Sequence, residues 1–235
     1  MIHARTPVAL LALKGIPSAR AQPGAYWEPL PHDVLLSCLL EGADVRKVLL
    51  VPAGLALSPN GAVLAAGFVW KNTPQRLEVP EGEHCLGLLS SNNGSRALRG
   101  YLGLITPGGT GVPLAEVVRH RHTRNLDLNQ QLAQLLDALR SGKVVRAALH
   151  HLQHKELSPA QAALLLSSAA KQKLMPWPRI GKVHATLQQC CGPSLPPTVT
   201  GWELLVRFAE VARANPPLKQ LEQIHAFTQL LLEHS

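Results

Sequence analysis

The sequence has few aromatic residues, few acidic residues and few cysteines, and each shortage restricts the kind of protein it can encode. Aromatic side chains make up 4% of the 235 residues, while hydrophobic residues reach 46% and are mainly Leu, Ala and Val. This combination favours close-packed helices with a modest sheet, in a globular rather than a disordered chain. The length allows one large domain or two small ones.

The four cysteines, Cys38, Cys85, Cys190 and Cys191, show neither metal-ligand spacing nor a disulfide framework. We therefore expect reduced thiols, as in a cytoplasmic protein. Long hydrophobic runs are also missing, because the apolar run at residues 8–13 is too short for a signal peptide or a membrane span. The sequence predicts a soluble, cytoplasmic protein without a membrane partner.

Acidic residues are outnumbered by basic ones, 15 Asp and Glu against 23 Lys and Arg, which gives a net charge of +8. Such an excess indicates a polyanionic partner, nucleic acid first and a membrane surface second, or only a basic surface. The excess is regional, because residues 140–182 contain eight Lys and Arg but a single acid, Glu156.

The spacing of apolar residues changes from short runs to helical periodicity near residue 125. We expect a strand and a connector in residues 1–25, a short helix over about 32–41, and strands and hairpins over 45–106 with a turn at SPNG. The predicted fold class is α+β, with a small antiparallel sheet in the N-terminal half and a helical C-terminal half. Residues 1–124 form the expected β-rich α+β region and residues 125–235 the helical region, either as two units or as one continuous domain.

The segment VVRHRHTRNLD concentrates arginine and histidine in a chain of low charge. His120 and His122 are two residues apart, so on an extended strand both point to the same side, as metal ligands do. No carboxylate or cysteine accompanies them, and the neighbouring arginines, Arg119, Arg121 and Arg124, would repel a cation. Phosphate contact is the favoured interpretation, because the donor fork of arginine matches phosphate oxygens. A catalytic histidine and a solvated strand-to-helix junction are the alternatives.

The segment SSNNGSRALRG is first of all a turn, since Asn and Gly tolerate a left-handed backbone. A turn that presents amide groups together with Ser95, Arg96 and Arg99 is also a candidate anion site. It is not a phosphate-binding P-loop, because the required Gly-Lys-Ser/Thr order is missing.

A predicted helix over residues 143–155 carries a polar stripe opposite its apolar face, formed by Lys143, Arg146, His150 and His154. This stripe is either a solvated face or a track for a nucleic-acid backbone. The two histidines also have zinc-ligand spacing, but the Glu of the metalloprotease motif is missing.

Five segments resemble, in the same order, parts of the phage- and plasmid-associated "domain of unknown function 932" family. Its early aromatic-Pro-His-helix segment resembles YWEPLPHDVLLSCL, its strand-turn-strand resembles LALSPNGAVLAAGFVW, and its strand with an Asn/Ser-rich turn resembles CLGLLSSNNGSRALR. Its Arg-His-Thr element resembles RHRHTRNLD, and its late aromatic-Leu helix resembles GWELLVRFAEVA. Together these segments span roughly residues 25–215.

One family element is missing from this sequence. After the Ser-rich turn, the family carries a strand ending in a Val-Cys-x-Asn-like element, which YLGLITPGGTGVPLAEVV does not contain. The family has no settled activity. The resemblance implies a mobile-element protein whose natural context is DNA metabolism, and it assigns no role to any residue.

Our first hypothesis is a non-enzymatic nucleic-acid-binding protein, with DNA favoured over RNA and single strands over duplexes. It would bind or anneal single strands, or assist recombination or repair, as a homo-oligomer without catalytic residues, cofactor or metal. The predicted nucleic-acid contacts are Arg96, Arg99, Arg119, Arg121, His122, Arg124, Lys143, Arg146, Lys171, Lys173 and Lys182.

The alternative hypothesis is a metal-dependent enzyme that acts on nucleic acid through its histidine-rich segments, either His120 and His122 or His150 and His154. Two-metal phosphoryl transfer normally uses several carboxylates. Few acids lie near the basic segment in the sequence, and they are Glu116, Asp127 and Asp137.

Overall fold

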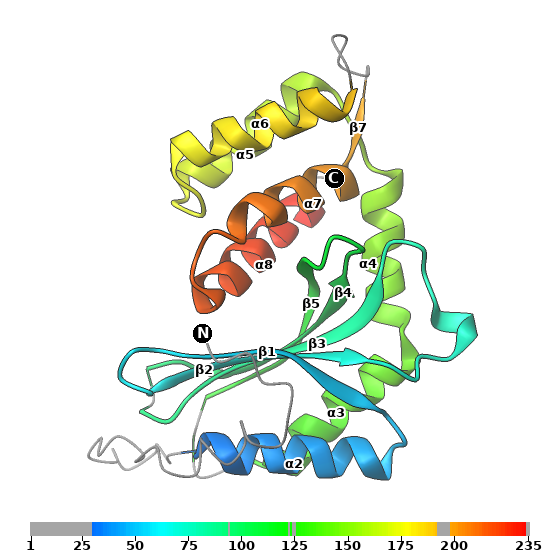
Figure 1. Ribbon diagram of the computed structural model, residues 1–235, viewed down its shortest axis with the longest axis vertical. Helices are drawn as coiled ribbons and strands as arrows, with labels where there is room; N and C mark the ends of the chain where they lie inside the picture. The colour runs from blue at the N-terminus through cyan, green and yellow to red at the C-terminus, as the bar shows by residue number, and fades with distance from the viewer. Residues whose placement is uncertain (1–29, 94, 122, 124–125, 192–197, 234–235) are drawn as a thin grey trace.

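A computed structural model of the chain describes residues 30–93, 95–121, 123, 126–191 and 198–233. At its centre is a five-stranded antiparallel sheet whose strands follow one another in chain order. Helices α2 and α3 lie on one side of this sheet and α7 and α8 on the other, with α5 and α6 stacked beyond α7 (Figure 1). The predicted α+β class, with an antiparallel sheet in the N-terminal half and helices in the C-terminal half, is confirmed. The strand predicted within residues 1–25 lies outside the described residues.

The sheet is a meander in which each strand pairs with the next through a hairpin. Side chains alternate between its two faces, as the pleat requires. On the second strand, Leu64 and Phe68 belong to the main core, whereas Ala65 packs on the opposite face against Leu221 of α8. The predicted SPNG turn joins the first two strands, and Gly61 there has a φ of 69°. The strands are β1 (Leu50–Leu57), β2 (Val63–Trp70), β3 (Glu83–Ser91), β4 (Leu98–Ile105) and β5 (Gly111–His120).

The helices begin and end at the capping residues that local sequence rules predict. The Asp127 side chain accepts a hydrogen bond from Gln130 N at the start of α3, and the helix ends at Gly142 with a φ of 61°. Ser158 and Gln161 form a reciprocal capping box at the start of α5. The helices are α2 (His32–Val45), α3 (Leu128–Ser141), α4 (Lys143–His154), α5 (Pro159–Lys171), α6 (Trp177–Cys191), α7 (Gly201–Ala212) and α8 (Pro217–Glu233), with the short elements η1 (Gln75–Leu77), β6 (Glu156–Leu157) and β7 (Val199–Thr200).

One hydrophobic core runs through both halves of the chain. Its buried residues extend from Leu30 to Leu231, so the helices after residue 125 pack into the same interior as the sheet. Phe208 of α7 and Phe227 of α8 stack at its centre, with ring centroids 4.0 Å apart and planes inclined by 13°. Among the described residues, no helix combines the length and the apolar character that crossing a bilayer requires.

Two strand glycines provide a matched test of the sheet. A Cβ atom on Gly103 would lie 2.0 Å from the carbonyl oxygen of Val112, a backbone atom that cannot retreat without disrupting β5. On Gly67 the nearest atom would be 3.9 Å away. We expect Gly103→Ala to lower the free energy of unfolding by about 2–4 kcal/mol, and Gly67→Ala to leave it equal or raised by about 0.5–1 kcal/mol. Urea denaturation measures the free energy of unfolding of both variants. Equal midpoints would contradict the close approach of β5 to Gly103.

Candidate nucleic-acid interface

The predicted cationic residues occupy three separate places in the fold rather than one track. Four are on β4 and β5 or their ends, two are on the first turns of α4, and three are on α5, α6 and the loop between them. In Figure 1, α4 stands at one side of the molecule, and the connection between α5 and α6 lies at the other. His122 and Arg124 lie outside the described residues. The three groups are Arg96, Arg99, Arg119 and Arg121; Lys143 and Arg146; and Lys171, Lys173 and Lys182.

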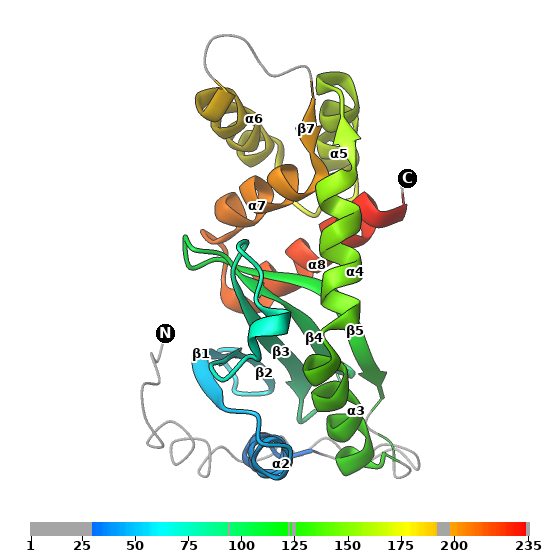
Figure 2. The ribbon, with the colours of Figure 1, turned by 90° about the vertical axis from the view of Figure 1, so that its right-hand side faces the viewer.

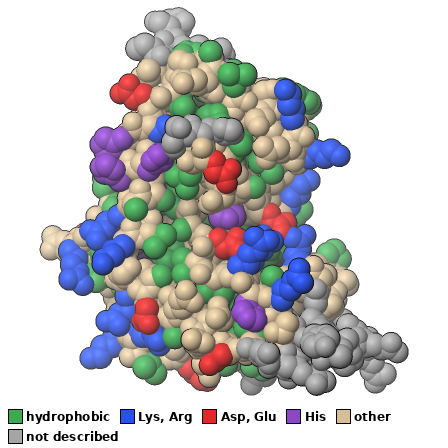
Figure 3. All heavy atoms as spheres, turned by 180° about the vertical axis from the view of Figure 1, so that it is seen from behind, with side chains coloured by type: hydrophobic (Ala, Val, Ile, Leu, Met, Phe, Trp, Pro, Cys, Tyr) green, Lys and Arg blue, Asp and Glu red, His purple; other side chains and the backbone are tan. Residues whose placement is uncertain are grey.

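The α4 group is built by an amphipathic helix. Val145, Leu149 and Leu152 are buried against the core, and this orientation leaves Lys143 and Arg146 exposed on the outer side. The predicted polar stripe of this helix is therefore confirmed as a surface feature. Figure 3 shows Lys and Arg side chains gathered over this side of the molecule, with histidines beside them.

Two further cations join this surface from other elements. Arg140 ends α3 one turn before α4 begins, and Arg76 lies on η1, whose Leu77 side chain packs against Gly142 at the α3–α4 junction. His84 of β3 fixes η1 there, because its Nε2 lies 2.8 Å from the Leu77 carbonyl oxygen. We call the four exposed cations at this junction the α4 patch: Arg76, Arg140, Lys143 and Arg146.

The cations of the α4 patch have no ion-pair partner among the residues that the structure describes. Elsewhere on the surface comparable cations are paired, such as Lys71 with Glu83 at 2.6 Å and Arg207 with Glu210 at 2.8 Å. The nearby Glu81 carboxylate instead accepts a hydrogen bond from the Gln153 side chain. The positive charge of the patch is therefore available to an anion from solution.

Burial lowers the pKa of His84 beneath the patch, and the charge of Arg146 lowers it further. This histidine is therefore neutral at physiological pH and serves as a structural support.

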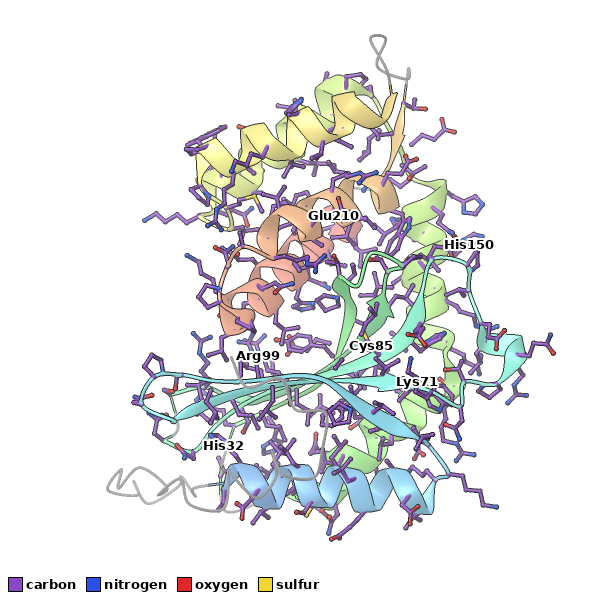
Figure 4. All side chains as sticks on the ribbon, viewed as in Figure 1. His32, Lys71, Cys85, Arg99, His150 and Glu210 are labelled. Carbon is purple, nitrogen blue, oxygen red and sulfur yellow. The ribbon has the colours of Figure 1, made fainter. Side chains whose placement is uncertain are left out.

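The histidines of α4 lie further along the same outer face. The rings of His150 and His154 stack with centroids 4.1 Å apart, and His154 Nδ1 lies 2.8 Å from the His150 carbonyl oxygen. In Figure 4, His150 lies on the outer side of α4, away from the sheet. The described part of the chain contains no group of three or more His, Cys, Asp or Glu side chains placed to hold a metal ion.

The β4–β5 group is divided between the surface and the interface with α8, because Arg96, Arg119 and Arg121 are exposed and only Arg99 is partly buried. Arg99, Tyr101 and Glu116 all face α8, where they meet His225. Tyr101 packs on the His225 ring at a centroid distance of 4.9 Å, and Glu116 Oε2 lies 3.3 Å from His225 Nε2. Arg119 Nε lies 3.8 Å from the other oxygen of Glu116. Figure 4 shows Arg99 in the layer between the sheet and α8.

Burial and the positive charges of two arginines control the protonation of this cluster. Burial lowers the pKa of His225 to about 4, and the positive charges of Arg99 and Arg119 act in the same direction. Burial also raises the pKa of Tyr101, and the hydrogen bond to Tyr101 raises that of Arg99. Sequence analysis missed His225, which lies more than 100 residues after the strands that it contacts.

The turn before β4, which is a candidate anion site, makes its contacts within the protein. Ser91 Oγ accepts a hydrogen bond from Arg96 N and donates one to Arg96 O, both at 2.9 Å, which closes the hairpin. The Arg96 side chain pairs with Glu222 of α8. Similarly, Nδ1 of His120 contacts the backbone carbonyl oxygen of Arg121. The residue Arg121 is itself exposed. The Arg96 side chain at this end of the sheet therefore helps to hold α8, while Arg119 and Arg121 stay exposed to solvent.

The third group is exposed but is distant from the α4 patch. Lys171, Lys173 and Lys182 all reach solvent on α5, α6 and their connection, where the Trp177 side chain is 57% exposed. From the sequence, two tryptophans are candidates for stacking on bases: Trp177, which lies between two prolines, and Trp70 at a strand end. Trp177 is exposed, as such a role requires, but Trp70 is buried and donates from Nε1 to Asn72, so the prediction for Trp70 was wrong.

Comparison with known proteins found no match: no family model, no curated protein and no solved structure is similar to this chain. The resemblance to the "domain of unknown function 932" family therefore stays a prediction. The site has to be interpreted from its own geometry.

The buried His225 predicts a specific dependence of stability on pH. Its folded pKa of about 4 lies below the unfolded value of 6.5, so between these pH values the unfolded chain binds the extra proton. The free energy of unfolding must therefore fall as the pH drops from 6.5 to 4.

Replacing this histidine with glutamine (His225→Gln) should make the fall less steep, by at most about 1.4 kcal/mol per pH unit, the effect of one proton. Part of the fall should remain, because burial also lowers the pKa values of His32 and His84. Urea denaturation at several pH values measures the slope, and an unchanged slope in the variant would contradict a buried, neutral His225.

Proposed function

We propose that the protein binds nucleic acid, in the first place single-stranded DNA, through the α4 patch and the outer face of α4. The observation that carries this proposal is a set of exposed arginine and lysine side chains from three elements that share one surface and lack acidic partners among the described residues. Arginine binds phosphate oxygens through two parallel donors, and lysine adds a flexible point charge.

The length of α4 suits a phosphate backbone. From Lys143 to His154 the helix rises about 16 Å at 1.5 Å per residue. Phosphates of one strand are about 3.4 Å apart along the axis of a B-form duplex and further apart on an extended single strand, so at most about four or five phosphates can follow the helix. Lys143 and Arg146 would contact the first of these, and the histidine rings further along would meet bases or sugars.

The shortage of aromatic side chains defines the kind of binding that we propose. Proteins that read single strands through stacking present several aromatic rings on one surface. The outer face of α4 offers histidine rings but no Phe, Tyr or Trp. Affinity should therefore come mainly from phosphate contacts, with little sequence preference and a strong dependence on salt. A role in annealing, recombination or repair, and assembly as a homo-oligomer, are proposals that follow from the sequence resemblance alone.

Charge-matched variants of two exposed regions test this proposal. One variant replaces Arg140, Lys143 and Arg146 with glutamine, and the other replaces Lys171, Lys173 and Lys182 in the same way, so that each loses three positive charges. Binding of a fluorescein-labelled oligothymidine is followed by anisotropy over a range of salt concentrations. The α4 variant should bind on the order of 10- to 100-fold more weakly, and the slope of log K against log salt should decrease by about two, since each lost phosphate contact on a single strand contributes about 0.7.

The second variant should retain most of the wild-type affinity and salt slope. Equal losses in both variants would show that net charge alone, and not the α4 surface, determines binding. If the wild-type protein does not bind at low salt, the proposed function is wrong. Duplex DNA and RNA of the same sequence, measured in parallel, decide between the classes of nucleic acid.

A further inference from the structure

A groove of about 430 Å³ lies on the side of the sheet that faces α8. Its floor contains three glycines that are neighbours across the strands: Gly54 of β1 pairs with Gly67 of β2, which pairs with Gly87 of β3. Gly87 in turn pairs with Tyr101 of β4, where the contact of the tyrosine ring with His225 closes this row against α8. The groove therefore opens where three adjacent strands all lack side chains.

Above two of these glycines the described residues leave open space. A Cβ atom on Gly54 would have no neighbour within 4 Å, and on Gly67 the nearest would be 3.9 Å away. Neither residue has a positive φ, so the backbone conformation does not require glycine. Glycine inside a strand costs stability relative to residues with side chains. What these glycines provide is room on the face of the sheet.

The lining of the groove is mainly apolar. Leu221 and Ile224 of α8 contribute to it together with small residues of β1 and β2, and Gln220 is a polar residue in the same lining. Burial raises the pKa of the Cys85 thiol to about 12, so this side chain is a neutral, unreactive group in the lining. The groove therefore has the character of a reversible binding site for an apolar molecule.

One cation stands at the rim of the groove. Arg213, just after α7, donates from Nη1 to the Gly108 carbonyl oxygen at 3.0 Å and to Thr110 Oγ1 at 3.4 Å, which orients its guanidinium on the 106–111 turn. No carboxylate among the described residues pairs with it. An apolar groove with an oriented, unpaired arginine at its rim is complementary to a molecule with an apolar chain and a single anionic end.

We propose that this groove binds a monocarboxylate with a long alkyl chain, of the fatty-acid class, with its chain over Gly54 and Gly67 and its carboxylate on Arg213. The volume lies within the usual range for sites of small molecules. Three strand spacings between β1 and β4 give a floor about 14 Å wide, which accommodates an extended chain. A peptide added as a strand at the edge of β1 is disfavoured, because Pro52 and the irregular pairing between Pro52 and Gly54 interrupt that edge.

Calorimetric titration of the full-length protein with dodecanoate tests this site, which is separate from the α4 patch. The wild-type protein should bind it, and octanoate should bind more weakly by about fourfold per missing methylene group. Methyl dodecanoate, which has lost the charge, should bind at least about tenfold more weakly than dodecanoate. Absence of dodecanoate binding, or equal binding of the ester, would overturn the proposal.

A variant whose groove is filled shows whether dodecanoate binds there. Gly67→Leu places a side chain in the groove, and because a Cβ atom on Gly67 would lie 3.9 Å from the nearest described atom, the fold should persist while dodecanoate affinity falls at least about tenfold. The matched control is Gly181→Leu on α6, where a Cβ atom would have no described atom within 4 Å; it should bind like the wild type. Arg213→Gln should reduce dodecanoate affinity while leaving that of the methyl ester unchanged.

If dodecanoate still binds to a folded Gly67→Leu protein with unchanged affinity, the ligand lies elsewhere and the groove is not its binding site. A synthetic peptide covering residues 5–16, which contains the apolar run at residues 8–13, is titrated in parallel. If this peptide binds and dodecanoate does not, the occupant is a segment of the chain itself and the fatty-acid proposal is wrong.

Discussion

The docking of α8 onto the sheet is the interaction on which the other features of the structure depend. Tyr101 of β4 packs on His225, and the Thr228 hydroxyl donates to the Pro113 carbonyl oxygen of β5 at 2.9 Å. On its other side, α8 stacks Phe227 on Phe208 of α7, so this helix is packed between the sheet and α7. Without it, the face of the sheet that carries Ala65, Leu89 and Tyr101 would be exposed, while α3 and α4 would still pack against β4 and β5.

The same docking explains which arginines remain available for a ligand. Helix α8 carries Glu222 and His225 over the end of the sheet, so Arg96, Arg99 and Arg119 face a carboxylate, an aromatic ring or a buried histidine. Arg96 and Arg99 are thereby engaged by the protein, whereas Arg119 and Arg121 remain exposed. No described acid forms an ion pair with the cations of the α4 patch, and the exposed residues of α4 are basic, polar or small apart from Val144, which is 41% exposed. The tertiary surroundings of a basic segment, rather than the number of basic residues in it, therefore decide whether it can contact a polyanion.

Sequence reasoning succeeded where the determinants are local. The polar stripe of α4 follows from residues within a few positions of one another, and it appears as predicted. The turn between β1 and β2 is equally local. Sequence reasoning failed where strand register, or packing between segments far apart in the chain, decides the structure. Arg76 reaches the α4 patch only because Leu77 packs on Gly142, and nothing within the sequence near either residue shows that contact.

The row of three glycines in the groove shows most clearly that sequence reasoning fails for contacts between distant segments. Taken one at a time, Gly54, Gly67 and Gly87 predict weak points or irregularities in three separate strands. Only the pairing of β1, β2 and β3 brings them into one row, and only the position of α8 turns that row into a groove. The α4 patch and the groove share no residue, and the groove is apolar where the patch is charged. The two proposed activities therefore depend on different physical forces, and a change in one site leaves the chemistry of the other intact.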